Sequence, residues 1–248
     1  MNEIKGKGIR KPQRLSEAYW LFGMVFVALG VAICSKADLG VSMIAAPPFI
    51  LQEVIVKYWS NCTVGTMEYI FQGFLLLLLC VTVQRIKLKY FFSFLVAFLY
   101  GLILDFWLLV LGREPFDAVW LRWIMLIVGD IVTALGVACF FRTYLPLQVY
   151  ELFVAEVADR YHFTVAKTKL FYDLASLLVS VLLAFCINLD ANEFDWSKIY
   201  AKAYHFIGAG TIVTTFINAP IIAFFSKLLT KLTGEEPLFP KVKAFFKK

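Results

Sequence analysis

Six long apolar runs constrain this chain more than any other feature of its sequence. Each approaches or exceeds the roughly 20 residues that an α-helix needs to cross a bilayer. Composition agrees, because 61% of the 248 residues are hydrophobic and only 17% are charged, which leaves too little polar surface to cover a water-soluble globule. We therefore expect an all-α integral membrane protein. The runs cover residues 18–35, 66–83, 90–111, 118–141, 167–187 and 204–229.

Two shorter apolar runs lie between the long ones. Residues 41–55 contain Pro47 and Pro48, and residues 145–158 open at Pro146. Apolar stretches of about 10–14 residues are more often re-entrant or interfacial than spanning. A broken backbone is tolerated at membrane depth only where protein or a water-filled cavity covers it. We predict six transmembrane helices plus two short re-entrant or half-spanning helices.

The positions of the basic residues favour six spans over eight. If the N-terminus is cytoplasmic, six spans place Lys87 and Arg142 on the cytoplasmic side, whereas eight spans place both outside. Basic residues near spans prefer the cytoplasm, so six spans are preferred. The formal charge of +6 lies mostly in two terminal clusters, which we interpret as cytoplasmic flanks beside lipid headgroups and not as a nucleic-acid surface. These clusters are Lys5, Lys7, Arg10, Lys11 and Arg14, and Lys241, Lys243, Lys247 and Lys248.

The sequence contains a weak internal repeat. Residues 29–32 (LGVA) recur 106 residues later as 135–138, and the same offset pairs Lys36 with Arg142 and Ser42 with Gln148. An offset of 101 then pairs Gln72 with Asp173. Each half crosses three times in the six-span arrangement, so the second half is inverted, as in many transporters. Eight spans would make the halves parallel. We expect a basic segment 1–17, a first repeat 18–111, a linker 112–117, a second repeat 118–229 and a basic tail 230–248.

Charged breaks follow the first span of each half. The sequences KADLGVS (36–42) and FRTYLPLQ (141–148) mark the points where a span ends and a short helix begins. A helix starting near Gly40 or Pro146 presents unsatisfied N–H groups and the positive end of its dipole. With Lys36 and Arg142 beside these ends, each half would offer a pocket for an anion. The alternative is that both cations snorkel to the interface and anchor the helix ends.

Polar residues within the spans are the other candidates for a binding site, because they are costly in a membrane and usually face the bundle interior. One interpretation is a polar path lined by Gln72, Asp130, Asp173 and Asn218. The other is simple hydrogen bonding between helices, with Asp173 pairing to Lys169 on its own helix. The candidate substrate-binding residues are Lys36, Ser42, Gln72, Asp130, Arg142, Gln148, Asp173 and Asn218.

Motifs for catalysis, nucleotide binding and metal binding are absent from the sequence. It has no Walker loop, nucleophile elbow or HExxH helix, and its five cysteines show no CxxC spacing. We expect no enzymatic activity, no metal and no cofactor. The expected partners are membrane lipids, a small solute, and a second copy or another membrane protein that completes so slim a bundle.

The phrases KADLGVSMIAAPPFILQE, TVGTMEYIFQG and ALGVACFFRTYLPLQVYELFV resemble the YczE/YyaS/YitT group of bacterial integral membrane proteins. The commoner pattern in that group reads Leu-Gly-Val-Ser-Pro-Trp-Asp, whereas Ser42 is followed here by Met43, Ile44 and Ala45. Any role of that aspartate is therefore not carried over to Ala45. The resemblance implies a multi-pass protein of the bacterial cytoplasmic (inner) membrane, and we expect both termini in the cytoplasm.

These features predict a small secondary transporter or permease-like protein. It would move a small solute, with an anion suggested by Lys36 and Arg142, by alternating access between the two repeats. One alternative is an accessory or scaffold protein that supports a membrane partner complex. A lipid-directed membrane enzyme is a further alternative.

Overall fold

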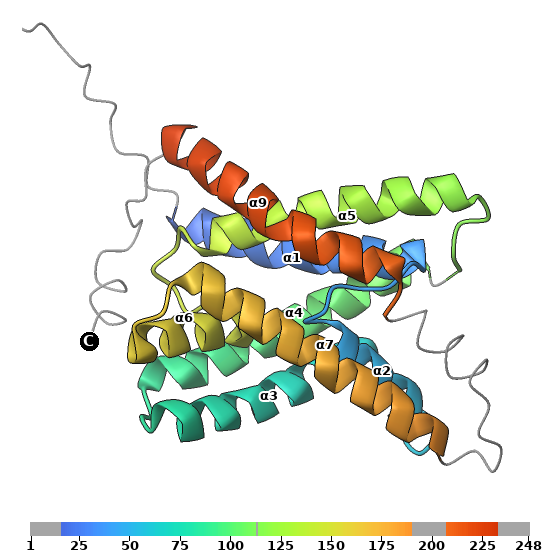
Figure 1. Ribbon diagram of the computed structural model, residues 1–248, viewed down its shortest axis with the longest axis horizontal. Helices are drawn as coiled ribbons and strands as arrows, with labels where there is room; N and C mark the ends of the chain where they lie inside the picture. Colours follow the sequence, from blue (N-terminus) through green and yellow to red (C-terminus); the bar gives the residue numbers. More distant parts are fainter. Residues whose placement is uncertain (1–15, 113, 190–206, 233–248) are drawn as a thin grey trace, which may run out of the picture.

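The computed structural model describes residues 16–112, 114–189 and 207–232, and within these residues all regular secondary structure is helical (Figure 1). Six of these helices are long and apolar enough to cross a membrane, which confirms the predicted number of long spans. Two are short. The basic terminal clusters and residues 204–206 of the last predicted span lie outside the described residues. The helices are α1 (Ser16–Ala37), α2 (Ala46–Ile55), α3 (Val64–Val83), α4 (Leu88–Leu111), α5 (Val119–Phe140), α6 (Val149–Tyr161), α7 (Val165–Leu189) and α9 (Ala209–Leu232).

Helices α1 and α5 cross closely at the centre of the bundle because both carry glycines at the crossing. A Cβ atom added to Gly30 would lie 2.6 Å from the backbone oxygen of Gly129. A Cβ atom added to Gly136 would lie 2.9 Å from the backbone oxygen of Gly23. Small residues let membrane helices approach until their backbones touch. Since Gly23 faces Gly136 and Gly30 faces Gly129, the two helices run antiparallel.

One end of the bundle, which we call the first end, is where α1 begins. The hydroxyl of Ser16 donates to Thr143 Oγ1 at 3.5 Å, just beyond the end of α5. At this end the hydroxyl of Tyr161, the last residue of α6, donates to the backbone oxygen of Thr82 near the end of α3 (3.1 Å). Glu156 of α6 accepts hydrogen bonds from Lys87, Lys89 and Tyr90 at the start of α4. The beginnings of α1 and α4 therefore share the first end with the finishes of α3, α5 and α6 (Figure 1).

The opposite end, the second end, is where α1 finishes. Lys36 Nζ donates to the backbone oxygen of Leu111, the last residue of α4. Arg122 Nη1 lies 3.2 Å from Asp38 Oδ2, which joins the start of α5 to the break after α1. The start of α9 also lies here, because its Gly210 N–H donates to the Leu39 oxygen at 2.8 Å.

The chain segment that contains each short helix leaves one end of the bundle and returns to the same end. Helix α2 leads back to the second end, where Gln52 Nε2 donates to the Cys62 oxygen at 3.2 Å. Helix α6 leads back to the first end through Tyr161. In Figure 1 both helices begin near the middle of the bundle, so neither connects the two ends.

The short helices begin later than the sequence predicts. Helix α2 starts at Ala46 and not at residue 41, because Gly40 takes a left-handed φ of +101° and two prolines occupy the first helical turn. Helix α6 starts at Val149 and not at residue 145, after an extended Gln148. Residues 43–45 before α2 therefore form a turn that is closed on the Ser42 oxygen, whereas Gln148 before α6 is extended.

Candidate functional site

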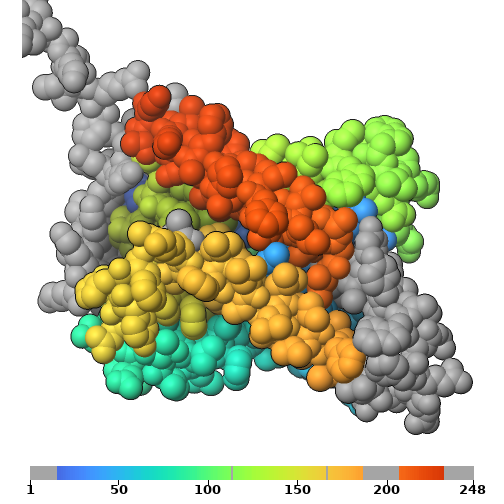
Figure 2. All heavy atoms as spheres, viewed as in Figure 1, coloured from blue at the N-terminus to red at the C-terminus, as the bar shows by residue number. Residues whose placement is uncertain are grey.

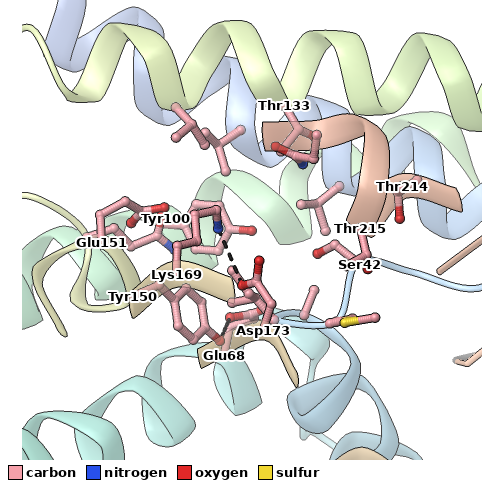
Figure 3. A pocket seen from close by; sticks show the side chains of 18 residues that line it. Ser42, Glu68, Tyr100, Thr133, Tyr150, Glu151, Lys169, Asp173, Thr214 and Thr215 are labelled. Carbon is pink, nitrogen blue, oxygen red and sulfur yellow. Dashed lines mark hydrogen bonds and ion pairs between the residues drawn. The ribbon is translucent and has the colours of Figure 1, made fainter. Parts of the chain in front are cut away.

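A cavity of about 60 Å³ lies where the beginnings of the two short helices meet the six long ones (Figure 3). Every described helix, or the segment just before it, contributes at least one lining residue. The polar or charged lining residues are Ser42, Glu68, Tyr100, Thr133, Gln148, Tyr150, Glu151, Lys169, Asp173, Thr214, Thr215 and Asn218.

A polar cluster joins α3 to the start of α6. Glu68 is fully buried, and its Oε2 atom accepts a hydrogen bond from the Tyr150 hydroxyl at 2.7 Å and one from Gln72 Nε2 at 3.4 Å. The Oε1 atom of Gln72 in turn accepts from the Val149 N–H at 3.3 Å. Because the first N–H groups of a helix have no partner within it, Gln72 satisfies one of those of α6.

Helix α7 carries a second pair of polar residues in the cavity. Lys169 Nζ lies 3.4 Å from Asp173 Oδ1, and both side chains point into the cavity (Figure 3). These two residues follow Glu68 and Gln72 by 101 positions and keep the same spacing of four, which places each pair on one helix face. Asp173 lines the cavity together with Ser42 and Ala45, ahead of α2. Each pair thus lies beside the short helix of the other half.

Asp130 lies behind the cavity wall and holds a residue that lines it. Its Oδ1 atom accepts a hydrogen bond from Asn218 Nδ2 at 2.9 Å, and its side chain is buried. Asn218 faces the cavity from α9. Asp130 therefore positions the Asn218 amide and does not itself line the cavity.

The cavity has an excess of acidic groups. Three carboxyl groups, of Glu68, Glu151 and Asp173, face one ammonium group, that of Lys169. Glu68 Oε1, Glu151 Oε2 and both amide atoms of Gln148 are buried without a hydrogen bond of ordinary geometry among the described residues. Buried polar atoms nearly always have a partner, so these atoms are expected to bind ordered water or a polar ligand.

Lys36 and Arg142 lie outside the cavity, at opposite ends of the bundle. Lys36 binds the end of α4, lies 5.1 Å from the ring centre of Phe116 and lines a separate cavity of about 240 Å³ at the second end. Arg142 donates to Thr230 Oγ1 at 2.6 Å near the end of α9, and it lies 5.5 Å from the ring centre of Tyr19.

Helix α2 does not offer the free N–H groups that an anion site at its start would need. The N–H groups of Ala45 and Ala46 both lie 3.0 Å from the Ser42 oxygen, to which they donate. Pro47 and Pro48, which come next, have no N–H group. The start of α2 is therefore closed by its own chain.

Six of the eight candidate residues come together. Ser42, Gln148, Asp173 and Asn218 line the cavity, and Gln72 and Asp130 each bind a residue at its wall. The candidates omitted Glu68 and Lys169, although each stands four residues before a named candidate on the same helix face. They also omitted Glu151, Tyr100 and Tyr150. Nothing in the sequence distinguishes Tyr100 from the other aromatic residues of its span.

Comparison with known proteins gives one match. No curated protein matches the chain, and no solved structure does. The proposed resemblance to the YczE/YyaS/YitT group has no support among these comparisons. A family model does match residues 15–227, which include all but the last turns of the helical bundle described above. The chain belongs to DUF6198, a family of unknown function.

Proposed function

We propose that this protein is a secondary transporter that exchanges a small organic cation for protons, and that it is built from two inverted repeats. The observation that carries the proposal is the central cavity, which has three carboxyl groups against one ammonium group and lies where both short helices begin. Binding sites at the interface of two inverted repeats, beside discontinuous helices, are typical of secondary transporters.

Packing between the halves supports the inverted repeat. Helices α1 and α5 cross antiparallel, and Gly23 and Gly30 are each 106 positions from a glycine of α5. Helix α2 packs on α7 of the other half, and α6 packs on α3. Helix α4 packs on α1 as α9 packs on α5. These two kinds of contact thus each occur twice, in opposite directions.

Contacts at the two ends follow the same scheme. At the second end Asp38, just after α1, pairs with Arg122 of α5. At the first end Tyr144, which is 106 positions later and just after α5, donates to Glu17 of α1. Lys36 holds the end of α4, and Arg142, its repeat partner, holds the end of α9. We infer that these last two residues are equivalent clamps, one at each end.

The geometry of α2 and α6 supports the re-entrant interpretation, because each begins inside the bundle and returns to the end from which its segment came. We assign the first end to the cytoplasm by the positive-inside rule. Its connectors carry Arg85, Lys87 and Arg142, together with Arg160 near the finish of α6. This assignment leaves the second end, with α2, on the outer side.

The charge of the cavity favours a cation over the anion suggested by the sequence. An ionised carboxylate is costly to bury unless a positive group accompanies it, and Lys169 offsets only one of the three. The carboxyl groups are spread round the wall and do not meet at a point. Among the described residues no group of three acidic, histidine or cysteine side chains could hold a metal ion. An organic ammonium group, whose charge can face carboxyl groups on several sides at once, fits this arrangement better.

Protons couple to the cation through the same carboxyl groups. When the cation leaves, the buried carboxylates lose their positive partner, and the neutral acid becomes the favoured form. Each cation released in one direction is therefore replaced by a proton, which is carried in the other direction. Glu68 belongs to the pair on α3 and Asp173 to the corresponding pair on α7, and we assign them this exchange.

Alternating access follows from the size of the cavity and from the clamps. About 60 Å³ is far below the roughly 300–1,000 Å³ of ordinary ligand pockets. We interpret this small cavity as that of an occluded form of the transporter. Opening the second end separates Lys36 from α4, and opening the first end separates Arg142 from α9.

Reconstituted vesicles test the proposal. Purified protein is placed in liposomes with an internal pH dye, and permanently charged quaternary ammonium probes from tetramethylammonium to decyltrimethylammonium are added outside. We expect proton release from the lumen, saturable in at least one probe. The response should be abolished in Asp173→Asn and retained in Asp159→Asn, which makes the same change at an exposed carboxyl group. If wild-type and protein-free vesicles respond alike to every probe, cation exchange is wrong and the accessory alternative gains ground.

A further inference from the structure

The interface between α3 and α4 of the first half has no counterpart of similar extent in the described part of the second half, and this difference exposes the cavity to the side. In the first half, α3 packs along α4. In the second half, α7 packs on α2 and α6, and α9 packs on α5, without a comparable interface between α7 and α9. Figure 2 shows a furrow between α9 and the pair α6 and α7. The central cavity is lined from both sides of this furrow.

Polar groups of the cavity reach the surface along the furrow. The Lys169 side chain is 21% exposed and that of Asp173 is 15% exposed, although both lie on a helix apolar enough to span a membrane. Across the furrow, Thr215 and Asn218 of α9 are partly exposed. A carboxyl group that is exposed at the side of the bundle, within a membrane-spanning segment, faces lipid and not water.

Apolar side chains surround these polar groups on both helices. On α7, Leu170 and Leu174 are about half exposed, and on α9, Phe216 and Ile217 are exposed as well. Such side chains suit the hydrocarbon part of a bilayer. The furrow therefore joins a polar, acidic interior to an apolar exterior over a short distance.

We propose that the cavity takes an amphiphilic ammonium compound that enters sideways from the membrane between α7 and α9. Its cationic head lies against Asp173, and its alkyl chain remains in the furrow among lipid chains. This inference rests on the proposed function, because it assumes that the bound group is a cation.

The size of the cavity fits this division of the ligand. A space of about 60 Å³ can admit a head group but leaves no room for a chain. A chain left in the furrow keeps the apolar surroundings that it had in the bilayer. Lateral passage also spares the ligand from crossing either closed end of the bundle.

A chain-length series tests the inference. Wild-type protein in lipid nanodiscs is titrated with trimethylammonium probes carrying methyl, butyl, hexyl, octyl and decyl chains. The dissociation constant is expressed against the free aqueous probe concentration. Binding to nanodiscs of the Asp173→Asn variant is subtracted, because it measures partition into lipid alone. We expect the specific affinity to rise about fourfold for each added methylene, the ratio that apolar transfer gives.

The outcomes separate the two proposals. If specific affinity is the same for every chain length, the ligand reaches the site from water, so lateral passage is wrong and cation exchange stands. If no probe binds specifically, both proposals fail.

A substitution at the furrow gives a second measurement. Thr215→Trp fills the mouth beside the cavity, whereas Ile212→Trp places the same bulk on an exposed position of α9 that does not line it. We expect Thr215→Trp to remove the chain-length dependence and Ile212→Trp to keep it. Equal chain-length dependence in both variants would overturn lateral passage.

Discussion

Replacing Gly30 by alanine tests the central crossing on which the inverted-repeat interpretation depends. The added Cβ atom would lie 2.6 Å from the backbone oxygen of Gly129 and 2.6 Å from the backbone nitrogen of Thr133. Ordinary van der Waals contact begins at about 3.4 Å, so the shortfall is about 0.8 Å. Backbone atoms of a packed helix cannot rotate away as side chains do. Helices α1 and α5 must therefore move apart.

The cost of Gly30→Ala follows from two opposing effects. Overpacking a close-packed core typically costs ~1–3 kcal/mol. Alanine is favoured over glycine within a helix by roughly 0.5–1 kcal/mol, which offsets part of that cost. Because the clashing atoms belong to backbone, we place the overpacking cost in the upper part of its range. The expected net loss is about 1–2 kcal/mol in the free energy of unfolding, or roughly 2–8 °C in melting temperature for a chain of this size.

Gly73→Ala is the matched control for this substitution. A Cβ atom there would meet only the Phe94 ring, at 3.1 Å, and the tip of a side chain can shift. The helix-propensity gain is the same, so we expect this variant to melt at or above the wild-type temperature. Both variants are compared by thermal unfolding in detergent with fluorescence-detected size exclusion. If Gly30→Ala is as stable as Gly73→Ala, the backbones of α1 and α5 do not touch and the proposed repeat interface is wrong.

Three further predictions concern the ends of the bundle and the cavity wall. Burial raises the pKa of Glu156, but hydrogen bonds from two lysines and a tyrosine outweigh it and hold that pKa below its ordinary 4.5. The stabilisation is therefore present above pH 4.5 and is lost as the pH falls through the lowered pKa. The melting temperature, measured from pH 7 to pH 3, should depend less on pH in Glu156→Gln than in the wild type. Lys36→Met should raise labelling of single cysteines by an impermeant reagent at the second end only, and Arg142→Met at the first end only. Asp130→Ala removes the acceptor of the Asn218 amide; a buried donor left without a partner costs ~1–3 kcal/mol, so this variant should bind the probe more weakly. Asp130→Asn keeps an acceptor and should bind the probe nearly as well as the wild type.

The long helices could be predicted from the sequence because a helix that crosses the bilayer needs a run of about 20 apolar residues, and such runs are visible in the sequence. The short helices were harder, since their starts depend on local geometry. Residues 41–45 are apolar enough to extend α2, but Gly40 adopts a positive φ and Ser42 closes the first turn with its backbone oxygen. No periodicity signals either feature.

The repeat identified which residues are equivalent but not whether equivalent residues meet. Gln72 and Asp173 lie near the middle of the bundle, and both belong to the region of the cavity. Lys36 and Arg142 lie at the ends of their helices and at opposite ends of the molecule, as the proposed inversion requires. In an inverted repeat only positions near the centre converge. The distance of a residue from the middle of the bundle therefore decides whether a matched pair can form one site. The sequence match alone does not give this distance.

The two proposed clamps hold helices that are packed to different extents. Lys36 donates one hydrogen bond to a backbone oxygen at the end of α4, where the helix dipole also favours a cation. Arg142 binds the Thr230 hydroxyl of α9 and lies over the ring of Tyr19 on α1, as Lys36 lies over the ring of Phe116, so each clamp combines a hydrogen bond with an aromatic contact. Helix α9 is the least buried of the six long helices, and it depends more on such an end contact than α4 does. The same residue of the repeat thus closes a well-packed helix on one side and a loosely packed helix on the other. Since α9 also forms one wall of the furrow, loosening Arg142 should affect both the opening of the first end and the width of the lateral passage, which links ligand uptake from lipid to release at that end.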